Sequence, residues 1–178
     1  MKRLLVIALI FLVLLVMQGC IAHDVCDTNL SNYGIWDKTT KDILEKSFFT
    51  LPSADNVKEF GQRYYYKASK SVLSDYNFVI CVELEFTDEI SYAEELTRLT
   101  QFLPSPIEHD STCIYGVQLS EENALEYLNT TIYDGAFYNF EIISANKDFN
   151  SLCYVYAHVW DYFEDEILAD TLESIFII

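Results

Sequence analysis

Five cysteines are the residues of this sequence whose chemistry depends most on their partners. Cys20 follows a long apolar run and is treated below, which leaves Cys26, Cys81, Cys113 and Cys153. Four thiols allow three complete disulfide pairings, and spacing alone does not select one. We expect either a disulfide among Cys81, Cys113 and Cys153 or small buried thiols, since free cysteine is among the most buried residue types. No CxxC pair is present, so we expect no metal site and no cofactor.

Two carboxylates are spaced as an acid–base pair in a glycoside hydrolase would be. Glu83 and Glu85 point to one side of a predicted strand. They belong to twenty Asp and Glu residues between positions 83 and 178, so their spacing has little specificity. His109 lies between Glu108 and Asp110 in a predicted solvated loop. We therefore assign no catalytic residue and expect a protein that is not an enzyme; a hydrolase of unknown substrate is the second alternative.

Aromatic side chains alternate along a late strand. Tyr154, Tyr156, His158 and Trp160 share one face, while the other face carries small apolar residues from Cys153 to Val159. The apolar face predicts core. The aromatic face predicts either a flat platform for a sugar ring or an aromatic peptide side chain, or a surface covered by a packed helix.

The charge of the chain is strongly acidic and unevenly placed. The formal net charge is -17, and residues 20–82 hold eight acidic against seven basic residues. Residues 83–178 hold twenty against two, Arg98 and Lys147. Such a field repels nucleic acid and attracts cations and basic peptides or proteins, although acidic residues also keep an exported domain in solution. We expect no nucleic-acid partner.

The N-terminus has the pattern of an export signal. Lys2 and Arg3 precede an apolar run from Leu4 to Met17, which spans about 21 Å as a helix against about 30 Å of hydrocarbon. Gln18-Gly19-Cys20 follows and resembles the lipobox of bacterial lipoproteins, although Met17 replaces the usual Leu. The resemblance implies a lipid on the thiol of Cys20, and two acyl chains suffice for stable attachment. An uncleaved anchor and an ordinary cleaved signal are the alternatives.

The rest of the chain predicts one α+β domain. We expect a mostly antiparallel sheet of about four to five strands with helices packed on one face. The organisation is a signal peptide over residues 1–19, a lipid-anchored tether over 20–36 and a single acidic globular domain over 37–178. Strands are predicted near 57–68, 76–86, 112–119, 133–145 and 152–160, and helices near 38–49, 90–103, 120–128 and 164–178.

The whole chain resembles the short uncharacterised lipoproteins of clostridia-like Gram-positive bacteria. The residues that carry the likeness are the lipobox, Tyr64-Tyr65-Tyr66 and the strand from Tyr154 to Trp160. It implies a location on the extracytoplasmic face of the cell membrane. The first functional hypothesis is a non-catalytic binding module for a basic or sugar-containing ligand. The alternative is an acidic inhibitor or immunity lipoprotein that blocks a basic enzyme.

Overall fold

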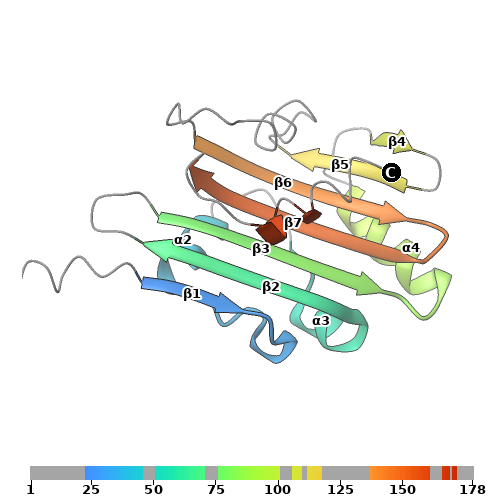
Figure 1. Ribbon diagram of the computed structural model, residues 1–178. Coiled ribbons are helices and arrows are strands. Elements are labelled where there is room, and N and C mark those ends of the chain that lie inside the picture. The colour runs from blue at the N-terminus through green and yellow to red at the C-terminus, as the bar shows by residue number, and fades with distance from the viewer. Residues whose placement is uncertain are drawn as a thin grey trace, which may run out of the picture.

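In the part of the chain that the structure describes, seven strands form one antiparallel sheet in the order β1-β2-β3-β7-β6-β5-β4 (Figure 1). This computed structural model describes residues 23–45, 51–70, 76–100, 106–109, 112–117, 137–160, 166–168 and 170–171. The α+β class and the antiparallel sheet are confirmed, and the sheet has more strands than the four or five expected. The order places strands from the N-terminal part of the chain in one half of the sheet and those from the C-terminal part in the other.

The strands are β1 (His23–Asp27), β2 (Gly61–Lys70), β3 (Tyr76–Glu85), β4 (Ile107–His109), β5 (Thr112–Val117), β6 (Phe137–Asn146) and β7 (Ser151–Trp160). The helices are η1 (Leu30–Asn32), α2 (Lys38–Leu44), α3 (Ala54–Phe60) and α4 (Glu89–Thr100), and short helical turns follow at 166–168 and 170–171. The helix expected at 120–128 lies outside the described residues.

The strand expected at residues 57–68 starts later than predicted. Residues 57–60 belong to α3, whose N-cap is Ser53 and whose C-cap is Gly61. The Ser53 hydroxyl accepts a hydrogen bond from the Asn56 N–H at 3.2 Å, which satisfies a backbone donor in the first turn. A Cβ on Gly61 would lie 2.3 Å from the Val57 carbonyl oxygen, so only glycine fits where the helix becomes β2. The helix therefore ends and the strand begins at Gly61, within a segment that its aromatic content alone assigned to one strand.

The expected tether is largely part of the fold, which corrects the prediction for residues 20–36. β1 pairs with β2 from His23 opposite Lys70 to Asp27 opposite Tyr66. η1 follows, and Tyr33 and Trp36 pack against the buried core. A strand of five residues at the edge of a sheet is too short and too polar to give a clear alternating pattern.

The hairpin between β6 and β7 has the pairing that its turn residues predict. Asn146 lies opposite Ser151, and the Asn146 side-chain oxygen accepts hydrogen bonds from the backbone of Asp148 and Phe149. Asn150 has a φ of 47°, a conformation that asparagine tolerates better than most residues. The Phe86 N–H donates to the Asn150 carbonyl at 2.9 Å, which joins this turn to the end of β3.

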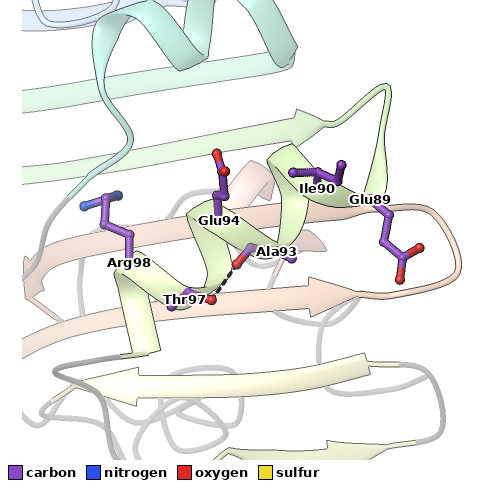
Figure 2. Close-up of a pocket in the computed structure, with 6 residues that line it drawn as sticks. All are labelled: Glu89, Ile90, Ala93, Glu94, Thr97 and Arg98. Atoms are coloured by element: carbon purple, nitrogen blue, oxygen red, sulfur yellow. Dashed lines mark hydrogen bonds between the residues drawn. The ribbon is translucent and has the colours of Figure 1, made fainter.

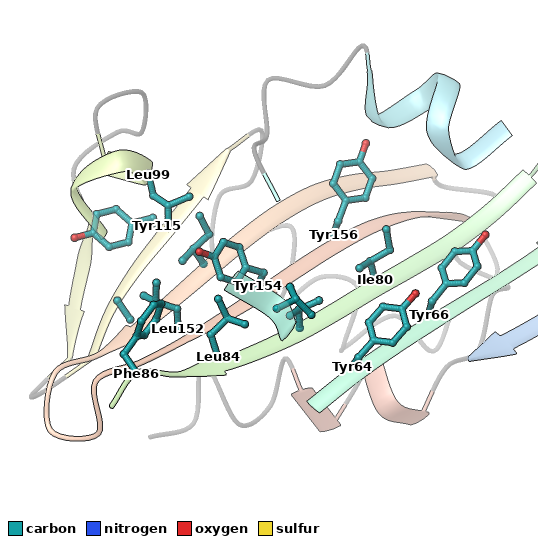
Figure 3. Packing of buried hydrophobic residues seen from close by; sticks show 14 of the residues in the cluster. Tyr64, Tyr66, Ile80, Leu84, Phe86, Leu99, Tyr115, Leu152, Tyr154 and Tyr156 are labelled. Atoms are coloured by element: carbon teal, nitrogen blue, oxygen red, sulfur yellow. The ribbon is translucent and has the colours of Figure 1, made fainter. Parts of the chain in front are cut away.

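One face of the sheet is the main core, and it is rich in tyrosine. Even-numbered residues of β3 and β7 stand on this face together with Tyr64 and Tyr66 of β2 (Figure 3). Val57 of α3 and Leu99 of α4 belong to the same buried cluster. The ring of Tyr156 stacks on Phe78 with centroids 5.3 Å apart.

The opposite face of the sheet carries smaller side chains. Val79, Val155, Ala157 and Val159 are fully buried, and so is Leu168 from the C-terminal helical turns. Ile167, in the same turn, is 45% exposed. The expectation that small apolar residues on β7 form core is confirmed, but the aromatic face is core as well.

Candidate functional site

Two of the four residues predicted as a ligand platform, Tyr154 and Tyr156, are buried. Tyr154 and Tyr156 are 0% and 1% exposed. His158 is half-buried with its ring against Phe78, at a centroid distance of 5.4 Å. Trp160 ends β7, and its side chain lies outside the described residues. Tyr154 and Tyr156 are therefore core residues and do not form a stacking platform.

Helix α4 binds the buried hydroxyl of Tyr154 on this face, whereas the buried Tyr92 hydroxyl has no hydrogen-bond partner among the described residues. The Tyr154 hydroxyl donates to Glu95 Oε1 of α4 at 2.8 Å. Arg98 holds the same carboxylate with two hydrogen bonds of 2.8 and 2.7 Å. Burial alone would raise the pKa of Glu95, but the bonds from Arg98 and Tyr154 outweigh it and hold this pKa below its usual value. An ionised carboxylate with these fixed partners has a structural role.

A second polar cluster joins α2 to the sheet. Asp37 is the N-cap of α2 and accepts from the Thr40 N–H at 2.9 Å, while Tyr66 and Tyr76 donate to its other oxygen. The Thr40 hydroxyl lies 2.9 Å from that of Tyr66 and 2.7 Å from that of Tyr76. Burial opposes ionisation of Asp37, but hydrogen bonds from Tyr76, Thr40 and Tyr66 lower its pKa. The cluster positions a helix and leaves no reactive group open.

The described cysteines lie on different faces, and no disulfide joins any two of Cys26, Cys81, Cys113 and Cys153. Cys113 belongs to the tyrosine-rich core, whereas Cys81 and Cys153 line a groove on the opposite face. Cys81 lies opposite Val155, so its relation to Cys153 is diagonal. Diagonal neighbours are about 7–8 Å apart, which is too far for a disulfide without backbone movement. Cys81 and Cys113 are therefore small buried residues, as the second of the two expectations states.

The groove on this opposite face is the best candidate for a ligand site. It has a volume of about 720 Å³ and lies across β2, β3, β7 and β6, with the C-terminal helical turns along one side. Tyr65, Cys81 and Cys153 contribute its less polar part. Neutral hydrogen-bonding side chains make up much of the remainder: Thr28, Gln62, Ser144, Asn146, Ser151 and Thr171.

The charges of the groove are few and mostly paired. Arg63 and Glu83 form an ion pair across β2 and β3 with Nε and Oε2 2.5 Å apart, and Asp170 is the other charged lining residue. Burial raises the pKa of the Cys153 thiol to about 12, helped by Glu83 and opposed by Arg63. The thiol is therefore protonated at neutral pH and is a poor nucleophile. This chemistry suits binding by hydrogen bonds.

Sequence reasoning missed the groove because its residues come from four strands and the C-terminus. Glu83 was singled out, but as a partner of Glu85 rather than of Arg63. Glu85 is exposed and does not line the groove. The sequence did contain one indication of the groove. Along β3, the smaller or polar residues Cys81 and Glu83 alternate with large apolar residues, so they lie together on the other face of the strand.

A second hollow, of about 580 Å³, lies on the outer surface of α4 (Figure 2). All of its lining residues belong to that one helix: Glu89, Ile90, Ala93, Glu94, Thr97 and Arg98. Arg98 already binds Glu95, and the Thr97 hydroxyl donates to the Ala93 carbonyl. A surface made by one helix gives a ligand no opposing wall, so we do not assign a site there.

No group of three or more His, Cys, Asp or Glu side chains in the described part of the chain is arranged to hold a metal ion. His109 is the last residue of β4. Of the acidic residues between positions 161 and 170, Glu166 and Asp170 are exposed, and Asp161, Glu164 and Asp165 lie outside the described residues. No helix within the described ranges is long and apolar enough to cross a membrane.

Comparison of the chain with models of protein families, with curated proteins and with solved structures found no match.

Proposed function

We propose that this chain is a membrane-anchored extracytoplasmic lipoprotein that binds a sugar-containing ligand in the groove without catalysis. The observation that carries the ligand class is the lining of the groove. Hydroxyl and amide side chains such as Ser144, Gln62 and Thr171 line the groove together with Tyr65. Sugars offer many neutral hydroxyls and an apolar ring face, which such a lining complements.

A basic ligand suits this groove less well, although the whole chain is acidic. Glu83 is already paired with Arg63, which leaves Asp170 as the remaining carboxylate in the lining. The protonated Cys153 thiol supports a binding role over nucleophilic catalysis.

For the architecture around the groove, we propose that α2, α3 and α4 cover only the tyrosine-rich face, since Val57, Tyr92 and Leu99 join its core.

The lipid anchor is tested by replacing its thiol. We expect wild-type protein in the membrane fraction with the mass of a lipidated chain that begins at Cys20. Cys20→Ala should leave the membrane fraction or keep its signal peptide, because the acyl chains then have no attachment point. An unchanged membrane fraction and mature mass in the variant would refute the lipoprotein assignment.

The ligand class is tested with the domain from residue 21 and a panel of neutral and acidic cell-wall oligosaccharides. We expect one oligosaccharide to bind with an affinity that changes little between low and high salt, since neutral hydrogen bonds dominate. Gln62→Ala and Asp170→Asn should weaken that binding by about 10-fold or more, because each removes a hydrogen bond to the ligand. Glu94→Gln, on the outer surface of α4, is the matched control. Failure of every sugar to bind would refute the proposal.

The charge distribution favours a second candidate, an acidic inhibitor of a basic enzyme. Residues 83–178 carry twenty acidic against two basic residues, and Glu85, Asp88, Glu89 and Glu94 are exposed. An inhibitor of this kind associates fast at low salt and loses its partner as salt rises. A pull-down from envelope and secreted fractions at two salt concentrations separates the candidates. Recovery of one basic protein at low salt alone would favour inhibition.

A further inference from the structure

The floor of the groove includes a row of residues that crosses four strands. Arg63 of β2 lies opposite Glu83 of β3. Glu83 in turn lies opposite Cys153 of β7, and Cys153 lies opposite Ser144 of β6. Neighbouring strands are about 4.8 Å apart, so the row is about 14 Å long. Its two charged members are at one end, and its neutral members are at the other.

The C-terminal helical turns place one more carboxylate at this groove. Leu168 is fully buried, and the Thr171 hydroxyl donates to the Ile167 carbonyl at 2.6 Å, so both residues hold these turns in place. Asp170 lies between Leu168 and Thr171 in the sequence and lines the groove. Among the described residues, none donates a hydrogen bond to the Asp170 carboxylate or forms an ion pair with it. Its oxygens are therefore available to a ligand.

Asp170 gives the groove a net negative charge. The charged lining residues are Arg63, Glu83 and Asp170, and the first two form an ion pair, which leaves Asp170 uncompensated. Lys67 of β2 and Lys147 of the β6–β7 turn do not line the groove. After position 98 the sequence has no Lys or Arg other than Lys147, so the undescribed residues of that part add no such side chain. The formal net charge of -17 also attracts cations from a distance.

We propose that the ligand is an amino sugar, whose protonated amine binds the Asp170 carboxylate while its hydroxyl groups bind the neutral side chains of the groove. This assignment rests on the proposed binding of a sugar there. An ammonium group donates a charge-assisted hydrogen bond to a carboxylate, and such a bond is about twice as strong as a neutral one. One bond of this kind among several neutral ones keeps the dependence of binding on salt small.

Other ligands match the groove less well. An acidic sugar would place its own carboxylate near Asp170, and the two like charges repel each other. A basic peptide supplies amines, but it lacks the ring hydroxyls that Gln62, Ser144 and Ser151 complement. A neutral sugar leaves the Asp170 carboxylate without a cationic partner. Of these ligands, the amino sugar alone matches both the charge and the neutral lining.

Two trisaccharides that differ only in acetylation test this inference. Triglucosamine has free amines, whereas tri-N-acetylglucosamine has the same rings with neutral amides. Calorimetric titration measures the binding of each to the full chain, purified in detergent, at pH 6. We expect triglucosamine to bind the wild type about 10-fold more tightly. Asp170→Asn should abolish this preference. Glu166→Gln, which removes an exposed carboxylate of the same turns that does not line the groove, should retain it.

The outcomes separate this inference from the proposed function. If neither trisaccharide binds and every neutral and acidic oligosaccharide also fails, both proposals are refuted. If the acetylated form binds as tightly as the free amine, sugar binding stands and the amino-sugar assignment is refuted. A preference for the free amine that persists in Asp170→Asn would overturn the role of Asp170. Trilysine supplies amines without ring hydroxyls, and tighter binding of trilysine than of triglucosamine would overturn the assignment in favour of a basic peptide.

Discussion

The two faces of the sheet differ in where their polar side-chain groups lie. On the tyrosine-rich face, the Tyr154 hydroxyl donates to Glu95 of α4, and the Trp36 indole N–H donates to the Tyr64 hydroxyl at 3.0 Å. On the opposite face, Val79, Val155 and Ala157 are buried and carry no polar side-chain group, and polar side chains such as Ser144 line the groove. Most buried hydroxyl groups form a hydrogen bond. A tyrosine can therefore belong to the core where another element supplies a hydrogen-bond partner for its hydroxyl.

The largest expected difference between the faces is in stability. Tyr154→Ala should lower the free energy of unfolding by about 3–5 kcal/mol, because it leaves a large cavity in the core. Cys153→Ala, the adjacent residue on the opposite face, should cost about 1 kcal/mol, since it removes one small group. Chemical denaturation of both variants measures the difference. Equal costs would mean that the tyrosine face is not the main core.

A conservative variant separates packing from hydrogen bonding at the same position. Tyr154→Phe keeps the ring and removes only the donor to Glu95. It should cost about 1.5–3 kcal/mol, the range for hydrogen bonds to charged groups. A loss as large as that of Tyr154→Ala would show that the Glu95 bond, rather than the ring, dominates.

Thiol reactivity probes the groove face directly. With its pKa raised to about 12, Cys153 should react with iodoacetamide at pH 8 about 1000-fold more slowly than an ordinary exposed thiol, since almost none of it is thiolate. Mass spectrometry of timed digests follows alkylation of Cys153 and of exposed Cys26 in the same sample. Comparable rates at both positions would show that the thiol of Cys153 is neither buried nor protonated as described.

Sequence patterns predicted the elements that have clear periodicity or caps. The alternation in β3, the helix α4 and the Asn-rich turn between β6 and β7 follow from local rules. β1 was missed because five edge residues carry little hydrophobic pattern, and α3 was missed because a cap and a glycine, rather than aromatic content, set its ends.

The candidate site was less predictable than the fold. Alternation along β7 placed Tyr154 and Cys153 on opposite faces correctly, but it does not tell which face a helix covers. That depends on Glu95 and Arg98, far along the chain from Tyr154. The groove depends on strand order, which brings Arg63, Glu83 and Cys153 into one row. These neighbours can be identified only once the order and the register of the strands are known.

The cluster at Asp37 predicts a pH-dependent difference within the tyrosine-rich face. Asp37→Asn keeps a capping side chain but loses the charge that accepts from Tyr66 and Tyr76. The folded pKa of Asp37 is lowered, so its ionised form stabilises the fold above about pH 4, and this stabilisation is lost as pH falls through the folded value. Wild type and variant should therefore differ most near pH 7, by about 1 kcal/mol because solvent screens this exposed carboxylate, and converge in acid.

Thermal denaturation between pH 2.5 and pH 7 measures this convergence. Asp42→Asn, in the exposed pair with Lys38 on the same helix, is the control and should show a smaller pH dependence. A constant difference between wild type and Asp37→Asn across the range would mean that the charge of Asp37 does not stabilise the fold.

The smallest expected effect is at the wall of the groove. The Arg63 side chain is 84% exposed, so its pair with Glu83 should contribute no more than about 1 kcal/mol to stability, and less at high salt. A double-mutant cycle of Arg63→Ala and Glu83→Gln isolates that coupling, and Lys38→Ala with Asp42→Asn provides an exposed pair for comparison. A coupling well above 1 kcal/mol would place the pair in a closed, dry environment. The groove would then resemble the tyrosine-rich face, and a ligand could not reach Glu83 without breaking the pair.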